Sequence, residues 1–193
     1  MEKKAKVAIL ASGRGSNAAA LISFAKNPGC SYHVELILSN KRSAKVLDLA
    51  KESGIEHDHF ARSSFYEDLT VIKTLKQHEI DLVVLAGFLW LVPSAIINHF
   101  PNRIINIHPA LLPKYGGKGM YGMNIHKAVK ENNEKESGIT IHFVNEKYDD
   151  GAIIFQASCP LSEEDTPANI AEKVFRLEHH FYPRIVNGVA GRI

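Results

Sequence analysis

The fold is decided near the start of the chain, where residues 7–25 read VAILASGRGSNAAALISFA. The apolar run Val7–Ala11 is typical of a buried strand, and Ala18–Ala25 has the composition of a helix. The glycine-rich segment Ser12–Asn17 joins the two. Strand, glycine-rich turn and helix make up the first unit of many nucleotide- or phosphate-binding α/β proteins.

The turn favours an anion. Backbone N–H groups are free at the start of a helix, and Gly15, Ser16 and Asn17 would supply them together with side-chain donors. The pattern is not a complete dinucleotide fingerprint, because Ala18 replaces the third glycine, and the lysine of a P-loop is missing. A tight turn in which the serine caps the helix is the alternative explanation.

Strands and helices alternate along the rest of the chain. Further strands are expected at Val34–Leu38, Ile55–Phe60, Leu82–Leu85, Arg103–His108, Ile139–Val144 and Ala152–Ser158. Helices are expected at Ala44–Lys51, Phe65–His78, Pro93–Phe100, Tyr121–Lys130 and Thr166–Val186, with Pro183 kinking or ending the last one. The pattern predicts an α/β fold of three αβα layers. Its sheet would be mostly parallel and Rossmann-like, with a late antiparallel hairpin.

Two of these segments carry more specific expectations. In the helix predicted at Phe65–His78, the apolar positions are Leu69, Ile72 and Leu75. The aromatic run Phe88–Val92 continues a strand past Gly87, either as core or as the lining of a pocket for a flat ligand.

Composition sets the broad class. The 193 residues are 45% hydrophobic and 23% charged, with a formal net charge of +2, which gives no case for a nucleic-acid or membrane partner. The two cysteines, Cys30 and Cys159, suit a reducing compartment, and Val7–Leu10 is too short for a signal segment or a membrane span. We expect a single domain over residues 1–193 in a soluble, cytoplasmic protein. No metal site is expected, because His57 and His59 have no third ligand nearby.

The chemistry is expected at Asn106 and His108, which end the predicted strand and project to the same side of it. A carboxylate from the turn at Asp149 and Asp150 would raise the pKa of the histidine, and a protonated His108 and the Asn106 amide could then donate to an oxyanion. No serine or cysteine nucleophile is evident beside them, so the set suits direct attack by a substrate amine on an acyl carbon. The alternatives are a strand-end histidine bonded to backbone and an ordinary hairpin turn.

At this point the sequence resembles a known family. The segment Asn106–Tyr115, NIHPALLPKY, resembles the signature loop of folate-dependent formyltransferases, and Tyr148–Gly151 resembles their second signature. The segments Ala11–Asn17, Leu38–Lys41 and Val83–Phe88 match the family in the same order. The resemblance implies the formyltransferase fold. It also implies transfer of a formyl group from the co-substrate 10-formyltetrahydrofolate to the amine of 5'-phosphoribosylglycinamide in de novo purine (IMP) biosynthesis.

The resemblance also implies roles for individual residues. The catalytic residues would be Asn106, His108 and Asp149, and the amine substrate would be held by Gly15, Ser16, Asn17 and Glu178. The folate would be bordered by Leu89, Trp90, Leu91, Val92, Asn106, Ile141 and Val144. The expected partners are these two small molecules, with no nucleic acid, membrane or metal, and the protein would be a monomer or a homodimer.

Other functions remain open at this stage. Family members that formylate methionyl-tRNA carry an additional C-terminal domain, and those that deformylate the folate carry an additional N-terminal one. The expected elements leave neither in this sequence. Outside the enzymes, a regulator could bind phosphate through Ser12–Asn17 alone, but it would not need Asn106, His108 and Asp149 together. A nicotinamide dehydrogenase is disfavoured by the missing third glycine.

Overall fold

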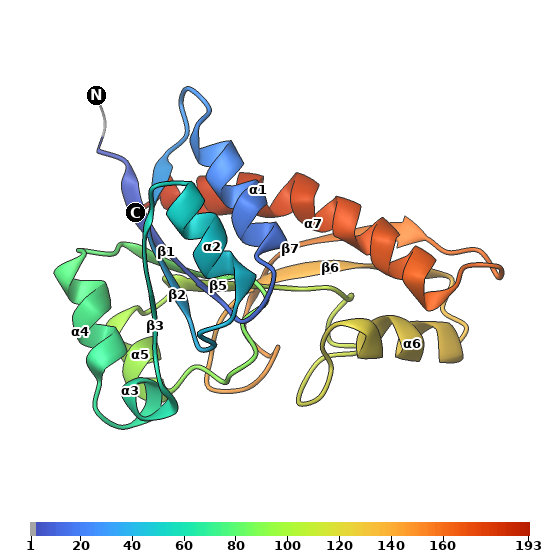
Figure 1. Ribbon diagram of the computed structural model, residues 1–193. Coiled ribbons are helices and arrows are strands. Elements are labelled where there is room, and N and C mark those ends of the chain that lie inside the picture. Colours follow the sequence, from blue (N-terminus) through green and yellow to red (C-terminus); the bar gives the residue numbers. More distant parts are fainter. Residues whose placement is uncertain (1–2) are drawn as a thin grey trace.

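The computed structural model describes residues 3–193 and builds them around one seven-stranded sheet (Figure 1). The strands are β1 (Ala5–Ala11), β2 (Tyr32–Ser39), β3 (Glu56–His59), β4 (Leu82–Leu85), β5 (Ile104–His108), β6 (Glu136–Phe143) and β7 (Ile153–Pro160), in the order β3-β2-β1-β4-β5-β6-β7. The first five run parallel, and β6 is antiparallel to both of its neighbours. The predicted fold class, with its late hairpin, is therefore confirmed. Residues 1 and 2 of the predicted domain range lie outside the described residues.

Helices cover both faces of the sheet. One face packs against α1 (Ser16–Ala25), α2 (Lys45–Glu52), α6 (Met123–Glu131) and α7 (Pro167–Ala190), and the other against α3 (Arg62–Tyr66), α4 (Thr70–Gln77) and α5 (Ser94–His99). Each face of the sheet has its own hydrophobic core, and side chains alternate along β1 between the two. Val7 and Ile9 face the first group of helices, while Ala8 and Leu10 face the second. A strand that is apolar on both sides is what a sheet between two helical layers requires.

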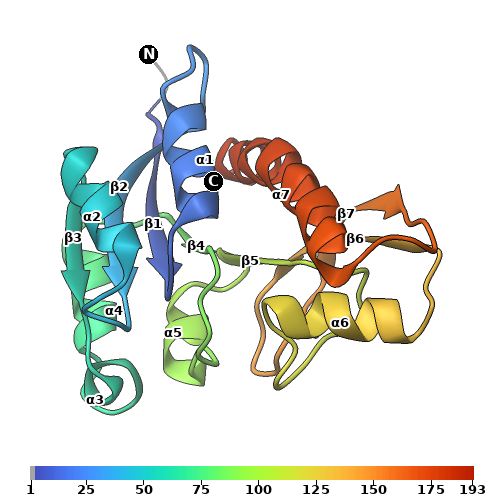
Figure 2. The ribbon, with the colours of Figure 1, turned by 45° about the vertical axis from the view of Figure 1, so that its right-hand side comes forward.

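The longest helix, α7, packs along β5, β6 and β7 and contacts both α1 and α6. It begins at a capping box, in which Thr166 accepts from the backbone N–H of Asn169 and the Asn169 side chain bonds back to Thr166. It continues through Pro183 to Ala190, so the proline does not end it as one of the two expectations had it. Figure 2 shows α7 lying between α1 and α6.

The hydroxyl of Tyr182 fixes α7 to the middle of the sheet. It is fully buried and donates to the backbone oxygen of Leu85, 2.8 Å away, with the backbone oxygen of Ile105 at 3.3 Å. These two residues belong to β4 and β5, the strands whose ends carry the predicted chemistry.

The helix predicted at Phe65–His78 is instead two short helices, α3 and α4, separated at Leu69. Leu69 has φ 57° and is 41% exposed, so its assignment to a helix face is wrong, whereas Ile72 and Leu75 are buried as expected. The break has a local cause. Asp68 Oδ1 accepts from the backbone N–H of Thr70 at 3.0 Å and from its hydroxyl at 2.6 Å, which starts a new helix.

The run Phe88–Val92 does not continue a strand. β4 ends at Leu85, and Gly87, with φ 71°, turns the chain out of the sheet. Phe88 and Val92 pack into the core beside α3 to α5, while Leu89 is 41% exposed. Both interpretations of this run therefore apply, since Phe88 and Val92 belong to the core and also line a hollow at the edge of the sheet.

Two glycines allow the hairpin β6–β7 to close. A Cβ atom at Gly138 would overlap the backbone oxygen of Ala157, and one at Gly151 would overlap the backbone oxygen of Phe143. Only glycine permits such an approach of two backbones. The turn that carries Asp149 is thereby pressed against the end of β6.

Two findings bear on the expected environment. No helix formed by residues 3–193 is long and apolar enough to cross a membrane. Cys30 is buried and Cys159 is half-buried, and both are free thiols.

Candidate active site

The predicted site residues meet at the carboxyl edge of the parallel strands, around two adjoining hollows. The larger has a volume of about 270 Å³, and its walls include Asn17, Asn106, His108, Asp149 and Glu178. The smaller, of about 50 Å³, is lined mainly by apolar side chains of the loop that follows β4 and of the hairpin. Asn106 and Asp149 line both hollows, so the polar cluster lies where the two meet.

His108 lies between two acceptors. Its Nε2 is 2.7 Å from the backbone oxygen of Tyr115, and its Nδ1 is 3.4 Å from Asp149 Oδ1. A carbonyl oxygen only accepts, so Nε2 carries a hydrogen and Nδ1 is the position at which a proton comes and goes. The ring is 4% exposed. It is thus oriented by backbone on one side and faces a carboxylate on the other.

The pKa of His108 differs from the expectation. Burial lowers it from its ordinary value, and this outweighs the charge of Asp149 and the hydrogen bond to Tyr115, both of which raise it. The prediction that Asp149 raises the pKa is correct in sign, but the prediction of a ring protonated near neutral pH is wrong. The neutral ring predominates at pH 7, and negative charge developing beside Nδ1 would draw a proton to it.

Asp149, rather than its neighbour, is the carboxylate that faces the histidines. Burial would raise its pKa, but the interaction with His142, the charge of His108 and the backbone N–H of Gly117 together hold the pKa below its usual range. Gly117 N–H donates to Asp149 Oδ2 at 2.9 Å, and Asp149 Oδ1 faces His108 Nδ1 at 3.4 Å. Asp150 points away, accepting from Asn145 and lying 3.7 Å from the Lys147 ammonium.

The structure adds His142, which the sequence analysis did not single out. Its Nδ1 lies 2.8 Å from the backbone oxygen of Phe143 and therefore carries a hydrogen, which leaves Nε2 to accept from the Asn106 amide at 3.2 Å. The same Nε2 is 3.8 Å from Asp149 Oδ1. His142 thus orients Asn106 and lies next to the carboxylate. A buried, ionisable residue within the apolar strand predicted at Ile139–Val144 was the available signal.

The turn Ser12–Asn17, which we call the anion-binding turn after its expected role, has the expected backbone. Gly15, with φ 82°, precedes α1, and no side chain caps the helix, so the explanation by a serine cap is not supported. A Cβ atom at Gly15 would lie 2.7 Å from Val46 Cγ2, because the turn packs directly on α2. Ser16 is exposed at the first position of the helix and Asn17 is buried.

Glu178 reaches this turn from α7. The Asn17 side-chain amide donates to Glu178 Oε1 at 3.3 Å, and the Asn17 Oδ1 atom is buried with no hydrogen-bond partner among residues 3–193. Burial raises the pKa of Glu178 to about 7, although the bond from Asn17 lowers it. Of the four residues expected at the amine substrate, Asn17 and Glu178 line the larger hollow, whereas Gly15 and Ser16 precede Asn17 in the turn and do not line it.

The loop that follows β5 is held by hydrogen bonds from side chains of β6 and β7. The Thr140 hydroxyl donates to the backbone oxygen of Ala110 at 2.7 Å and accepts from the Leu112 N–H at 3.0 Å. Gln156 donates to both Thr140 and the Leu112 backbone oxygen. These bonds fix the chain that leads to the Tyr115 carbonyl, and so fix the acceptor that orients His108.

Most of the residues expected at the folate line the hollows. Trp90, Leu91, Val92, Asn106 and Val144 line the smaller one, and Leu89 lines the larger. Ile141 lines neither. It is fully buried in the core shared with α7, because side chains alternate along β6 and those of His142 and Val144 face the hollows instead. The assignment of Ile141 to the folate is therefore wrong.

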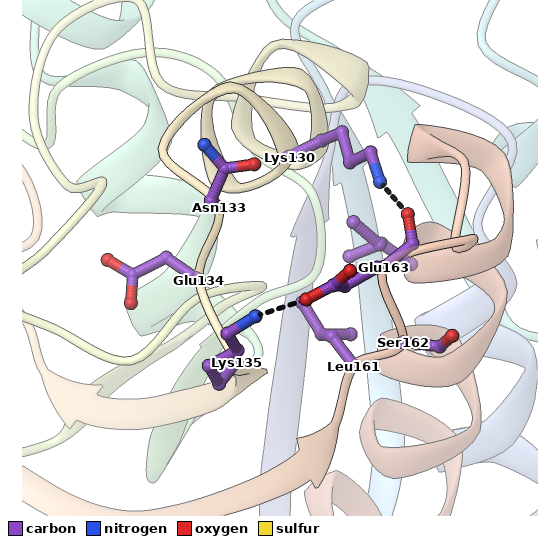
Figure 3. A pocket seen from close by; sticks show the side chains of 8 residues that line it. Lys130, Asn133, Glu134, Lys135, Leu161, Ser162 and Glu163 are labelled. Carbon is purple, nitrogen blue, oxygen red and sulfur yellow. Dashed lines mark hydrogen bonds and ion pairs between the residues drawn. The ribbon is translucent and has the colours of Figure 1, made fainter.

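A third hollow, of about 390 Å³, lies far along the sheet, between the end of α6 and the start of α7 (Figure 3). Its two lysines are engaged with Glu163: Lys130 donates to the backbone oxygen at 2.6 Å, and Lys135 pairs with the carboxylate at 3.0 Å. The walls contain no histidine or cysteine and none of the predicted site residues. It offers none of the chemistry found at the carboxyl edge of the parallel strands.

Comparison with known proteins agrees with this geometry. Residues 5–186 match the family model described as formyl transferase. The chain belongs to the formyl transferase family. It is 37% identical over 192 residues to "Phosphoribosylglycinamide formyltransferase, chloroplastic" of Arabidopsis thaliana, covering 97% of this chain and 66% of that protein. It is 36% identical to "Trifunctional purine biosynthetic protein adenosine-3" of Drosophila melanogaster, covering 98% of this chain and 14% of that protein.

The fold of this formyl transferase is shared with solved structures. The phosphoribosylglycinamide formyltransferase of Anaplasma phagocytophilum superposes with a TM-score of 0.88 at 34% identity, covering 98% of this chain and 88% of that one. The chain spans less than two thirds of the two curated relatives just named. The family predicted from the sequence is confirmed.

Proposed function

We propose that this formyl transferase moves the formyl group of 10-formyltetrahydrofolate to the amine of 5'-phosphoribosylglycinamide, a step of de novo purine biosynthesis. One observation carries the proposal: Asn106, His108 and Asp149 converge between an apolar hollow and an anion-binding turn. The names of the relatives, which include phosphoribosylglycinamide formyltransferases and a purine biosynthetic protein, support the same substrate.

The two hollows suit the two substrates. The smaller one is lined by Trp90, Leu91, Val92 and Val144, which offer a flat apolar surface to a pterin ring. The larger one ends at Asn17 and Glu178, beside the N-terminus of α1, where a phosphate is favoured by the helix dipole and free N–H groups. The amine and the formyl group would meet where Asn106 and Asp149 line both.

The chemistry follows from the donors at that point. The substrate amine attacks the formyl carbon, a C–N bond forms and the carbonyl oxygen becomes an oxyanion. The Asn106 amide donates to this oxygen, and the growing charge favours protonation of His108 at Nδ1, so that the ring becomes a second donor. The bond to folate N10 then breaks. The proton lost by the attacking nitrogen passes by way of Asp149 and His108 to the departing nitrogen.

The direct test is an assay with two arms. The purified protein is given 10-formyltetrahydrofolate with phosphoribosylglycinamide in one arm and without any amine in the other. We expect formylated product and tetrahydrofolate in equal amounts in the first arm and negligible formate in the second. Formate release without the amine would identify a deformylase instead, and no turnover in either arm would contradict the proposal.

Four further expectations from the sequence belong to this proposal. Residues 1–193 would act as one catalytic domain, in the cytoplasm and without a metal ion. The protein would work as a monomer or a homodimer. The two free thiols are compatible with a reducing compartment. Activity that persists after treatment with a strong chelator would support metal-free catalysis.

A further inference from the structure

The larger hollow has an unusual balance of charge for a site that would bind a phosphate ester. Two carboxylates, Asp149 and Glu178, line it, and Glu178 lies next to the anion-binding turn. A phosphate dianion entering this hollow meets negative charge, and the backbone N–H groups of a helix start supply only partial positive charge. The lysine that P-loops place at this position is missing from the turn.

One lysine supplies the opposite charge. Among the described residues, Lys118 is the single lysine or arginine in the wall of the larger hollow. Arg14 belongs to the anion-binding turn, and its side chain is exposed like that of Lys118, but it does not line the hollow.

The backbone around Lys118 is fastened to the reacting centre. The preceding residue, Gly117, donates its N–H to Asp149 Oδ2 at 2.9 Å. One residue earlier, a Cβ atom at Gly116 would lie 2.6 Å from Leu112 Cδ2 and 3.2 Å from Asp149 Cβ, so the chain passes tightly over the carboxylate. Gly117 and Gly119 have φ of 94° and 91°, a conformation that turns the chain sharply on both sides of the lysine.

Lys118 is also without a partner. No hydrogen bond or ion pair joins its ammonium to any residue between 3 and 193, whereas the nearby Lys114 pairs with Glu134 at 2.8 Å and Lys147 with Asp150 at 3.7 Å. A lysine whose backbone is fixed at the wall of a ligand hollow, and whose side chain is paired with no protein carboxylate, is suited to an anionic group of the ligand.

We propose that Lys118 binds the phosphate of the amine substrate and is the principal side-chain cation for it. This inference rests on the proposed function. Two sources of anion are available, the phosphate of the amine substrate and the carboxylates of the folate tail. Lys118 lines the hollow that contains Asn17 and Glu178 and is not part of the apolar one, so the phosphate is the source the geometry favours.

The test replaces the lysine by an uncharged side chain of similar length, Lys118→Met, and separates the two substrates. KM for phosphoribosylglycinamide should rise about tenfold or more, which is the loss expected for one charge-assisted hydrogen bond, while KM for 10-formyltetrahydrofolate stays within twofold. Lys118→Arg should restore most of the affinity. The matched control is Lys127→Met, at an exposed position on α6 outside all the hollows described above, which should behave as wild type.

A substrate without the phosphate makes the test specific. With the dephosphorylated glycinamide ribonucleoside, the ratio of wild-type to Lys118→Met kcat/KM should fall to about one. An unchanged KM for phosphoribosylglycinamide, an increase confined to the folate, or an increase in Arg14→Met but not in Lys118→Met would overturn the inference.

Direct binding separates this inference from the proposed function. Calorimetry with phosphoribosylglycinamide alone should show tight binding to the wild type and about tenfold weaker binding to Lys118→Met. Binding of equal strength to both would overturn the role of Lys118 and leave the proposed function standing. Clear binding to the wild type only, without formyl transfer, would contradict the proposed function while supporting Lys118. No binding to either protein would overturn both.

Discussion

The two parts of the sheet bring residues to the site in different ways. In the parallel part, β1 to β5, each strand ends at the same edge, so the anion-binding turn and His108 come together simply because their strands are parallel. The antiparallel hairpin β6–β7 delivers Asp149 through its turn, which reaches that edge only if β6 and β7 are paired in one register. The first arrangement follows from topology, whereas the second depends on close packing at a few residues.

The largest expected effect concerns the parallel part. His108→Ala removes the group that would become a second oxyanion donor and carry a proton, so kcat should fall about a hundredfold or more. The melting temperature should change little in comparison, since the strand pairing of β5 uses backbone only. Turnover near the wild-type value would contradict the proposed chemistry.

The next effect compares two adjacent carboxylates of the hairpin turn. Asp149→Asn removes the charge that raises the pKa of His108, so that pKa should fall further and activity should drop about tenfold or more. Asp150→Asn, beside Lys147 at the surface, should change neither. The His108 pKa is followed by NMR titration of its ring proton signals. If Asp150→Asn shifts that pKa and Asp149→Asn does not, the two roles are assigned the wrong way round.

A glycine pair tests whether the hairpin depends on close packing. Gly151→Ala would place a Cβ atom on the backbone oxygen of Phe143, and we expect it to destabilise the protein by about 2–4 kcal/mol and to displace the Asp149 turn. Gly188→Ala, inside α7 with no atom within 4 Å of the new Cβ, should stabilise it by about 0.5–1 kcal/mol. Urea unfolding measures both. Equal stabilities would show that the hairpin has room to adjust.

The smallest expected effect is the pH dependence of stability that comes from Glu178. Burial raises the pKa of Glu178 to about 7 in the folded protein, above the value of about 4.3 for an exposed glutamate. Between these two pH values the unfolded chain loses the proton of Glu178 while the folded protein keeps it, and this lowers the free energy of unfolding. This cost appears as the pH rises above about 4.5 and is complete above 7. Glu178→Gln should therefore stabilise the protein by about 1–2 kcal/mol at pH 8 and by almost nothing at pH 4.5. Thermal melting at the two pH values provides the measurement, and a gain that is independent of pH would argue against the buried acid.

The sequence was informative wherever local pattern determines structure. Apolar runs predicted six of the seven strands, and the polar β3 was expected only as a short segment at Ile55–Phe60. The spacing of Asn106 and His108 predicted that both face one side of β5, and both line the larger hollow. Even the choice of Asp149 over Asp150 as the carboxylate facing the histidines agrees with the structure.

The differences arise where tertiary contacts decide. Leu69 fits a helical repeat, but the Asp68 carboxylate accepts a hydrogen bond from the Thr70 hydroxyl, and a new helix begins there instead. Ile141 and His142 are adjacent in sequence, so their side chains point to opposite faces of the sheet. Which of the two faces the hollows depends on how β6 is oriented in the sheet. The direction in which the pKa of His108 shifts could not be predicted from the presence of Asp149 alone. Asp149 raises this pKa, but burial of the ring lowers it by more, and the depth of burial is not evident from the sequence.

The contact between Gly15 and Val46 has an evolutionary consequence. Gly15 needs its positive φ, and its Cα packs against Val46 so closely that a Cβ atom would lie 2.7 Å from Cγ2. A bulkier residue at 46 would push the anion-binding turn outward, although Val46 lines neither of the two hollows. Selection for phosphate affinity should therefore restrict the size of residue 46 among relatives, and any drift there should be accompanied by compensating changes along α2.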